Sequence, residues 1–363
     1  MAADVVVIGA GMVGAACAYY CGAAGLRVTV VERGSVAAGT TGAGEGNVLV
    51  SDKESGPELD LALWSLALWR DLAAAHGPSF EYEPKGGLVV ASTDAELAAL
   101  RTFVEDQRAA GVVAEPVTDL ASHEPDLAPD LAGGYYYPQD AQVQPMLAAG
   151  HLLRLSGATL LLGTSAHEIT DGGVRTSAGF VAAGAVVNAT GAWAGELADV
   201  PIRPRRGFVL VTEPLPPRIR HKVYAAGYVA DVAADDGSLR TSPVVEGTKS
   251  GTVLIGATRE RVGFDRTPSL PALRALAQGA IALFPFLRDV NALRAYSGFR
   301  PYSPDHLPVI GADPHRANLW HACGHEGAGI GLAPATGAMI AALLTEAEPD
   351  VDPTPFRADR FTA

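Results

Sequence analysis

The chain has 363 residues, which is long enough for two domains at roughly 150 residues each. Hydrophobic residues make up 48% and charged residues 18% of the chain, a globular composition that argues against wholesale disorder. The formal net charge of −13 disfavours a nucleic-acid partner, because a polyanion would be repelled and the sequence holds no continuous basic stripe.

The cysteines and the apolar N-terminal segment indicate where in the cell the protein is located. Three cysteines cannot build a disulfide framework, and their spacing matches no zinc motif, so we expect buried thiols, no metal site and a cytoplasmic location. The apolar N-terminal run starts at Asp4 instead of a basic residue, and glycines interrupt it, so it predicts a strand and a turn and not a signal peptide. No run of about 18 apolar residues occurs elsewhere, so we expect no transmembrane segment.

The first third of the chain shows one strand–helix–strand unit followed by two helices. Residues 4–8 and 26–31 are β-branched runs on either side of an Ala-rich stretch at 12–24. This order predicts a βαβ unit with a parallel sheet. Broad apolar faces predict helices at 58–76 and 94–110.

The rest of the chain alternates between two patterns. Short alternating segments at 86–91, 206–212 and 252–258 are separated by turns rich in Pro and Gly, and they predict antiparallel strands of a second domain. A buried strand at 185–191, and a strand that leads through glycines into a helix at 319–345, predict a return to the first domain.

The first strand–helix turn carries a dinucleotide-binding fingerprint. GAGMVG places Gly9, Gly11 and Gly14 between the strand and the helix, and Glu32 closes the second strand. Gly9 permits the tight turn, Gly11 lets a pyrophosphate approach the helix N-terminus, and Gly14 lets helix and strand pack closely. Glu32 can accept hydrogen bonds from ribose hydroxyls and would repel the 2′-phosphate of NADP. The pattern predicts a dinucleotide site.

The segment after Glu32 favours FAD over NAD. Arg33 is followed by the loop AAGTTGAGEGN, whose glycines allow it to fold over a pyrophosphate and to reach toward a flavin ring. Glu45 is unusual in such a loop, and it either holds a substrate ammonium or caps a turn.

Five separated motifs carry a family resemblance. They are GAGMVG with VVERG, VVNATGAWA, RPRRGFVLV, GFRPYSPDHLPVIG and GHEGAGIGLAPATG. In these motifs, and in their order from Val5 to about Leu344, the chain resembles the FAD-dependent D-amino acid oxidase superfamily. It is most similar to glycine oxidases, D-amino acid dehydrogenases and the flavin subunits of hydroxyproline-type dehydrogenases, and GEGNVLVSDK at 44–53 most resembles the last group.

The resemblance implies an α/β fold with a discontinuous Rossmann-type FAD-binding domain. An α+β substrate-binding domain built on an antiparallel sheet is inserted between its pieces. We expect residues 1–80, 143–200 and 296–363 to form the FAD-binding domain and residues 81–142 and 201–295 to form the substrate-binding domain.

The resemblance also implies non-covalent FAD. The stretch 298–311 lacks the cysteine that bonds to FAD in many sarcosine oxidases, and Cys323 is a weak substitute. The backbone of Ala166 would meet the adenine, the glycine loop before the last helix would approach the flavin, and His325 either contacts the cofactor or is a structural histidine. The expected cofactor-binding residues are Gly9, Gly11, Met12, Val13, Gly14, Glu32, Arg33, Thr40, Thr41, Gly44, Gly46, Asn47, Ala166, Ala189, Thr190, Gly191, His325, Gly327, Gly329, Ile330, Gly331 and Leu332.

Arg300 in GFRP resembles the arginine that pairs with the substrate carboxylate in glycine-oxidase-like members. A guanidinium fork can fix both carboxylate oxygens and so aim the Cα hydrogen at flavin N5. Glycine oxidases carry a second basic residue where this chain has Gly327, so Arg300 needs other help. Tyr228 and Tyr296 are candidates for that help, although each is as readily a packed core tyrosine, and Glu45 completes the candidate catalytic set.

These residues predict an FAD-dependent enzyme that oxidises the C–N bond of a small amino or imino acid by hydride transfer. Residues 44–53 favour substrates like D-proline and D-hydroxyproline. The alternatives are a glycine, sarcosine or D-alanine oxidase, a 2-hydroxy acid oxidoreductase of the same fold, and a non-catalytic flavin subunit of a complex. The electron acceptor would be oxygen, a quinone or a redox partner subunit. The resemblance at residues 44–53 slightly favours a dehydrogenase over an oxidase.

Overall fold

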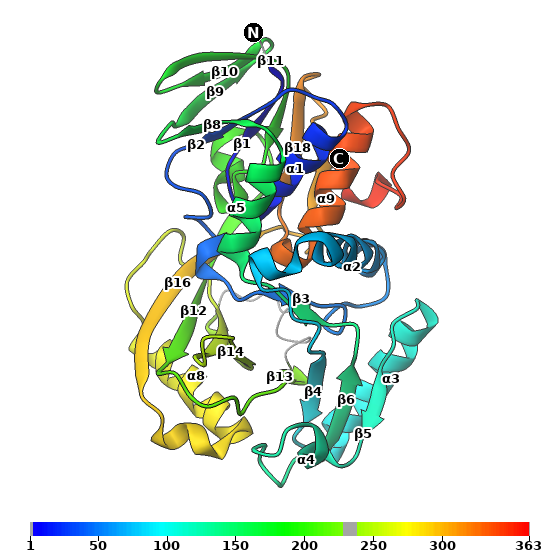
Figure 1. Cartoon of the computed structure of the whole chain (residues 1–363), viewed down its shortest axis with the longest axis vertical. Helices are drawn as coiled ribbons and strands as arrows, with labels where there is room; N and C mark the ends of the chain where they lie inside the picture. The colour runs from blue at the N-terminus through cyan, green and yellow to red at the C-terminus, as the bar shows by residue number, and fades with distance from the viewer. Residues whose placement is uncertain (1–2, 228–237, 363) are drawn as a thin grey trace.

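The computed structural model describes residues 3–227 and 238–362, and two eight-stranded sheets dominate it. One sheet occupies the upper half of the view in Figure 1 and the other the lower half. A two-stranded ribbon of β3 (Asn47–Val48) and β7 (Ala141–Gln142) lies where the halves meet. The mixed α/β architecture predicted from the sequence is confirmed.

The first sheet is built around the predicted βαβ unit. Its central strands follow the order β18-β11-β1-β2-β8, and all of these neighbours pair in parallel. At one edge β17 pairs with β18 antiparallel, and β10 and β9 extend β11 as an antiparallel flap. The strands are β1 (Ala3–Ile8), β2 (Val28–Glu32), β8 (Thr159–Leu162), β9 (Ala166–Thr170), β10 (Gly173–Thr176), β11 (Gly179–Asn188), β17 (Val309–Ala312) and β18 (Leu319–Cys323).

Four helices pack in this half. They are α1 (Met12–Ala23), α2 (Pro57–His76), α5 (Pro145–Leu155) and α9 (Gly329–Leu344). Helix α1 touches α9 most closely at Gly337, where an added Cβ would lie 2.5 Å from the carbonyl carbon of Ala16. Small residues on both helices therefore let the last helix of the chain lie directly on the first.

The second sheet follows the order β16-β12-β15-β14-β13-β4-β6-β5. Its neighbours are antiparallel except for β13 and β4, which run parallel. The all-antiparallel expectation was wrong at this pair, because side-chain alternation indicates strands but not their direction. The strands are β4 (Gly87–Ala91), β5 (Glu115–Val117), β6 (Gly133–Tyr137), β12 (Arg203–Thr212), β13 (Lys222–Ala225), β14 (Arg240–Gly247), β15 (Val253–Arg259) and β16 (Ala292–Tyr302).

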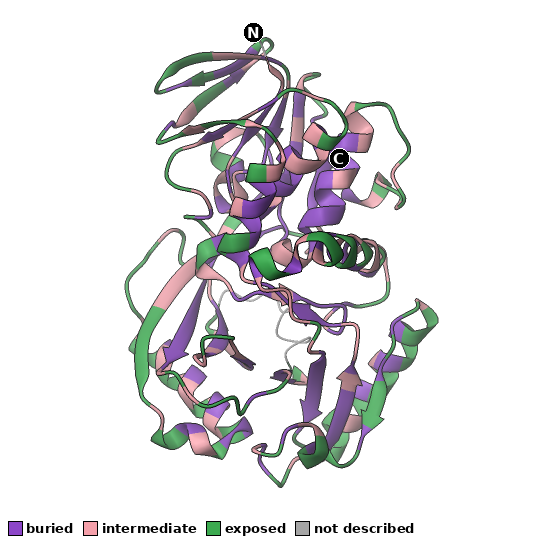
Figure 2. Cartoon of the chain, viewed as in Figure 1, coloured by how far each residue is buried: buried purple, intermediate pink, exposed green. Residues whose placement is uncertain are grey.

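The two faces of the second sheet have different neighbours. One face packs under α8 (Leu270–Leu283) and buries Phe208, Val245 and Ile255 in a core of its own. The opposite face turns toward the first half, and Val89 and Val244 join the core of that half. In Figure 2 the inner strands of both sheets, such as β1 and β4, are buried, whereas much of β16 and the outer sides of the helices are exposed.

The remaining elements are short or peripheral. They are α3 (Asp94–Ala109), α4 (Leu120–His123), α6 (Ala194–Leu197) and the 3-10 turns η1 (Thr41–Ala43), η2 (Gly77–Phe80), η3 (Gly191–Trp193), η4 (Pro285–Asp289), η5 (Thr354–Phe356) and η6 (Ala358–Phe361). Within the described ranges, no helix has both the length and the hydrophobicity needed to cross a bilayer. All three cysteines are buried and unpaired.

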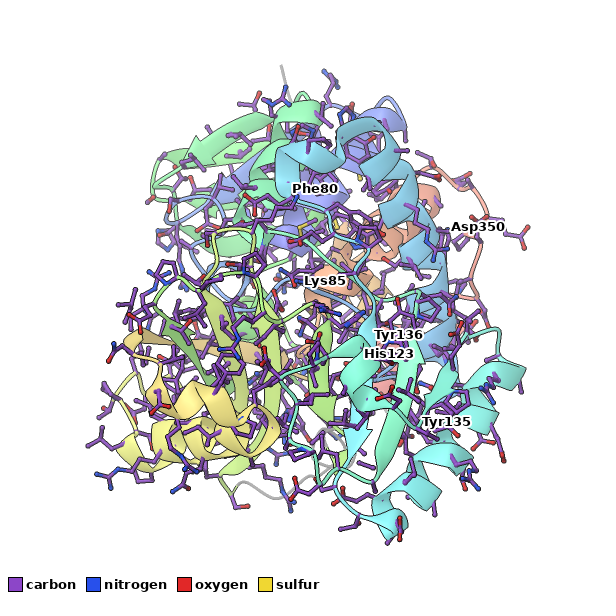
Figure 3. The ribbon with its side chains drawn as sticks, turned by 60° about the horizontal axis from the view of Figure 1, so that its bottom comes forward. Phe80, Lys85, His123, Tyr135, Tyr136 and Asp350 are labelled. Atoms are coloured by element: carbon purple, nitrogen blue, oxygen red, sulfur yellow. The ribbon has the colours of Figure 1, made fainter. Side chains whose placement is uncertain are left out.

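The chain passes between the halves several times. In Figure 3, Phe80 lies in the half built on the first sheet, Tyr135 and Tyr136 lie in the other half, and Lys85 lies between them. Strand β16 pairs with β12 along its whole length. We propose that the division into an FAD-binding and a substrate-binding part holds as predicted, with the last crossing placed after Tyr302 so that β16 stays intact.

The contact between α1 and α9 makes a prediction about stability. We expect Gly337→Val to lower the free energy of unfolding by about 1–3 kcal/mol, because the added carbons would push the two helices apart. Gly150→Ala in α5 is the matched control, since no heavy atom lies within 4 Å of its added Cβ, and it should cost nothing. Urea denaturation followed by circular dichroism measures both, and equal midpoints for the two variants would contradict the prediction.

Candidate active site

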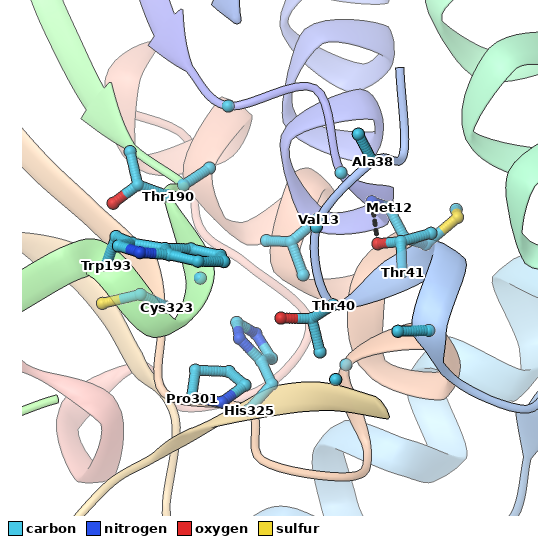
Figure 4. A pocket seen from close by; sticks show the side chains of 18 of the residues that line it. Met12, Val13, Ala38, Thr40, Thr41, Thr190, Trp193, Pro301, Cys323 and His325 are labelled. Atoms are coloured by element: carbon cyan, nitrogen blue, oxygen red, sulfur yellow. Dashed lines mark hydrogen bonds between the residues drawn. The ribbon is translucent and has the colours of Figure 1, made fainter. Parts of the chain in front are cut away.

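A cavity of about 650 Å³ lies between the two sheets. Its walls come from the β1–α1 turn, the end of β2, the loop at 33–47, the end of β11, strand β16 and the loop between β18 and α9. Figure 4 shows Met12 and Thr41 on one side of it and Trp193 and Cys323 on the other. The predicted residues that line it are Gly9, Gly11, Met12, Val13, Glu32, Arg33, Thr40, Thr41, Gly44, Glu45, Asn47, Ala166, Ala189, Thr190, Gly191, Arg300, His325, Gly327, Gly329 and Ile330.

The N-terminus of α1 opens onto this cavity. Gly9 has a φ of 109°, and a Cβ there would lie 2.5 Å from the carbonyl oxygen of Ala189. The Met12 amide donates to Thr41 Oγ1 at 2.9 Å, so the following loop folds over the start of the helix. No side chain caps the helix at Gly11, and its first turn holds no acidic residue. The positive end of the helix dipole is therefore available to an anion.

Glu32 is held rigidly at one end of the cavity. Its Oε2 accepts a hydrogen bond from the Ala10 amide at 2.9 Å, and its Oε1 accepts one from the Gly34 amide at 2.8 Å. Each oxygen keeps a lone pair for another donor. A vicinal diol such as a ribose supplies two such donors.

A stack of side chains closes the outer wall. The ring of Trp193 lies on that of Phe264, with centroids 5.0 Å apart and planes at 9°, and the Arg33 guanidinium lies 4.1 Å from the Trp193 ring. Thr40 Oγ1 donates to the Phe299 carbonyl at 2.6 Å. Trp193 was not predicted to line the cavity, although it stands inside the ATGAWA motif. No sequence motif around Phe264 indicated that it would stack on Trp193.

His325 lines the cavity and is also held by a buried hydrogen bond. Its ring lines the cavity, and burial lowers the pKa of His325 to about 3, so the imidazole is neutral. Its Nε2 lies 2.8 Å from Thr336 Oγ1, which donates its own proton to the Leu332 carbonyl. Nε2 must then be the donor, which leaves Nδ1 as an acceptor.

Arg300 lies in a slot between two glycines. A Cβ at Gly207 would lie 2.1 Å from its Nη1, and one at Gly327 would lie 3.7 Å from its Nε. Nη1 donates to the Thr258 carbonyl at 2.8 Å, which fixes the guanidinium against the second sheet. Gly207 therefore gives the Arg300 side chain its room, whereas a Cβ at Gly327, where a second basic residue was missing, would make only an ordinary van der Waals contact with it.

Glu45 also lines this cavity. Its side chain is 8% exposed, and its Oε1 has no hydrogen-bond partner. The carboxylate lies against β15, where a Cβ on Gly256 would come within 2.7 Å of that oxygen. Burial raises the pKa of Glu45, and the charges of Lys222 and Arg300 oppose this effect.

Some predicted residues lie outside the cavity lining. Gly14 and Gly46 are packing positions, where an added Cβ would meet the carbonyl oxygens of Gly9 and Val143 respectively. Tyr296 donates its hydroxyl proton to the Gly44 carbonyl at 3.4 Å. Gly331 and Leu332 border a small separate cavity, and Tyr228 falls outside the described residues.

The cavity fits an elongated dinucleotide. Glu32 offers acceptors to a ribose at one end, the open α1 N-terminus meets a diphosphate, and the glycines before α9 leave room for a flat ring beside Arg300. The family model for FAD-dependent oxidoreductases matches residues 4–343. The chain belongs to the FAD-dependent oxidoreductase family.

Relatives extend over the whole chain. The chain is 30% identical to the hydrogen cyanide synthase subunit HcnC of Pseudomonas aeruginosa, covering 99% of this chain and 96% of that protein. It is 32% identical to the bifunctional protein ThiO/ThiG of Trichormus variabilis over 99% of this chain, but it spans only 55% of that longer protein. The solved structure of glycine oxidase from Geobacillus kaustophilus superposes with a TM-score of 0.89 at 30% identity, covering 99% and 98% of the two chains.

Cys323 sets the form in which this FAD-dependent oxidoreductase holds its cofactor. The thiol lines the cavity, but burial raises its pKa to about 12. It therefore stays a protonated thiol and a poor nucleophile at neutral pH. We accordingly expect the FAD to dissociate on denaturation.

The position of Glu32 predicts its contribution to cofactor affinity. We expect Glu32→Gln to raise the Kd for FAD about tenfold, because hydrogen bonds to a charged acceptor are stronger than those to an amide. Titration of the apoprotein with FAD, followed by flavin fluorescence, measures this Kd. Glu168→Gln, at an exposed site on β9, is the control, and an equal Kd in both variants would show that Glu32 makes no contact with the cofactor.

Proposed function

We propose that this FAD-dependent oxidoreductase oxidises the C–N bond of a small amino or imino acid held between Arg300 and Glu45. One observation carries the proposal: a fixed guanidinium and a buried carboxylate with an unpaired oxygen line the same cavity. A zwitterionic amino acid presents a carboxylate and an ammonium group that match these two charges.

Each residue then has a defined task. Arg300 binds the substrate carboxylate, and its bond to Thr258 keeps the fork in one orientation. Glu45 Oε1 accepts a hydrogen bond from the substrate nitrogen. The bound FAD supplies the hydride acceptor. Since Cα lies between the two anchored groups, the residues hold its hydrogen in one direction, which is the positioning that hydride transfer requires.

The shape of the cavity favours a small substrate. Gly207, Val209 and Gly298 form the wall on the second sheet, and Ala43 lies so near Gly298 that a Cβ there would clash at 2.6 Å. Proline-type imino acids lead the candidates because of the motif at 44–53, and glycine, sarcosine and D-alanine follow. The similarity to a glycine oxidase supports glycine as a candidate.

A 2-hydroxy acid remains the second candidate, because Arg300 would bind its carboxylate equally well. It offers Glu45 a single hydroxyl donor and no positive charge. Placing a carboxylate without a counter-charge beside a neutral group is less favourable than pairing it with an ammonium. The unpaired oxygen of Glu45 therefore favours the nitrogen compounds.

An anaerobic titration of the purified enzyme tests the proposal. Loss of the visible flavin absorption is followed with D-proline, D-hydroxyproline, D-alanine, glycine, sarcosine and 2-hydroxyglutarate. Bleaching by an amino or imino acid supports the proposal, and admitting air then separates an oxidase from a dehydrogenase. Bleaching by 2-hydroxyglutarate alone would overturn the proposed oxidation of an amino or imino acid. Failure of every compound would favour a flavin subunit that needs partners.

Arg300 gives a sharper prediction. We expect Arg300→Ala to raise the substrate concentration for half-bleaching about a hundredfold, because the carboxylate loses two charge-assisted hydrogen bonds. Arg300→Lys should recover part of the loss, since it restores the charge but not the fork. Arg294→Ala, on an exposed position of the same strand, is the control and should leave the titration unchanged. Equal titrations for Arg300→Ala and this control would remove Arg300 from the site.

A further inference from the structure

Unsatisfied polar atoms gather behind Glu45. Among the described residues, Glu45 Oε1, Asn47 Oδ1 and Gln142 Oε1 are buried without a hydrogen-bond partner, and Lys222 Nζ and Glu246 Oε2 form a buried ion pair beside them. Buried polar atoms are rarely left unpaired in native proteins, and groups of them mark sites for water or ligands. The three unpaired atoms are all oxygens, so the cluster favours hydrogen-bond donors.

The strand register brings these residues together. Lys222 on β13 stands directly opposite Glu246 on β14, and the two side chains form an ion pair with each only 1% exposed. On the next strand, Gly256 lies opposite Val244, two residues from Glu246, and the Glu45 carboxylate rests on Gly256. The Lys222–Glu246 pair therefore lies on the face of the sheet that Glu45 covers.

The charges that face Glu45 come from three strands. Lys222 and Arg300 favour its ionised form, whereas burial and Glu246 oppose it. Tyr296 faces it as a neutral phenol, because burial and the two carboxylates raise the pKa of that tyrosine.

A second cation lies behind the pair. Lys85 Nζ donates to the Gly247 carbonyl at 2.5 Å and lies 3.9 Å from Glu83. Burial lowers the pKa of Lys85, whereas Glu246 and Glu83 raise it. In Figure 3, Lys85 marks this region between the two halves of the molecule.

We propose that Lys222 and Glu246 are positioning residues that fix the charge of Glu45, and that Glu45 accepts the proton which the substrate nitrogen must lose before oxidation. This inference rests on the proposed function. A substrate ammonium has no electron pair for C=N bond formation. An N–H bond must break, with the proton bonding to Glu45 Oε1 and the pair staying on nitrogen. The pair then forms the C=N bond as the Cα hydrogen leaves as a hydride for FAD.

Glu45 needs both members of the ion pair, because neither Lys222 alone nor Glu246 alone would let its carboxylate act as a base. A buried carboxylate without a cation stays protonated and accepts nothing. A carboxylate that faces only Lys222 and Arg300 would be so acidic that it would hold the proton poorly. Burial raises the pKa of Glu45, and Glu246 offsets part of the opposing effect of Lys222, so the carboxylate holds a proton more tightly than an exposed one.

Opposite shifts in two single variants test this inference. The rate of anaerobic flavin reduction is measured against pH in stopped flow, using the amino or imino acid that bleaches the wild-type flavin. Lys222→Met should move the acid limb of the profile to higher pH by about one unit, because Glu45 loses a cation. Glu246→Gln should move the limb to lower pH by about one unit.

A second readout does not depend on turnover. The infrared band of the protonated Glu45 carboxyl, assigned by its absence in Glu45→Gln, is titrated in the substrate-free holoenzyme and should show the same opposite shifts. Lys249→Met, at an exposed lysine after β14, is the control and should shift neither the rate profile nor the band. Should Lys222→Met fail to fold, Glu246→Gln alone still requires a downward shift.

The outcomes separate the two proposals. A wild-type flavin that no amino or imino acid reduces overturns the proposed function and the proton step together. A flavin that is reduced, with profiles that do not move in opposite directions, overturns the role of the ion pair alone. An acid limb that persists in Glu45→Gln overturns Glu45 as the proton acceptor.

Discussion

The close approach of three backbone segments determines the rest of the site. An added Cβ at Gly9 would lie 2.5 Å from the Ala189 carbonyl oxygen, and one at Gly14 would lie 2.0 Å from the Gly9 oxygen. Only glycines allow the β1–α1 turn, the first helix and the end of β11 to meet in this way. This contact directs the α1 N-terminus into the cavity and brings the Thr41 loop over it. The cofactor site is therefore a consequence of missing side chains as much as of present ones.

The second sheet contributes fixed charges instead of open backbone. Arg300 is oriented by the carbonyl of Thr258 on β15. On the next two strands of the sheet, Glu246 of β14 is paired with Lys222 of β13. Burying such charges is costly, and a chain gains nothing in stability over well-packed apolar residues by doing so. Their concentration on the face that turns toward the cofactor half is consistent with a chemical task.

Local patterns predicted much of this structure. The helix at 94–110 is observed at Asp94–Ala109, and the βαβ unit, the fingerprint acid Glu32 and the family all follow from contiguous residues. Motifs predicted much of the cavity lining, as for Arg300 and Thr190, but not Trp193, which stands inside the ATGAWA motif.

What the sequence could not predict depends on register. Lys222 and Glu246 are separated by 24 residues along the chain and meet only because β13 and β14 pair in one alignment. The parallel pairing of β13 with β4 could not be predicted from the alternation of side chains. Parallel and antiparallel strands show the same pattern of inward and outward side chains. Likewise, Phe264 joins the wall through a stack with Trp193, a residue of the other half. These features require tertiary structure.

The order of the strands has a consequence for biosynthesis. The fingerprint at residues 9–14 leaves the ribosome long before its late partners, because β11 pairs with β18 at Leu319–Cys323, and α1 is covered by α9 at Gly329–Leu344. A nascent chain that stops short of these elements has the glycine turn but not the loop that carries His325 and Gly327. The cofactor can be enclosed only after α9 has been synthesised, so the segments made earlier must persist without it, and chaperones rather than FAD would have to shield their apolar surface during that interval.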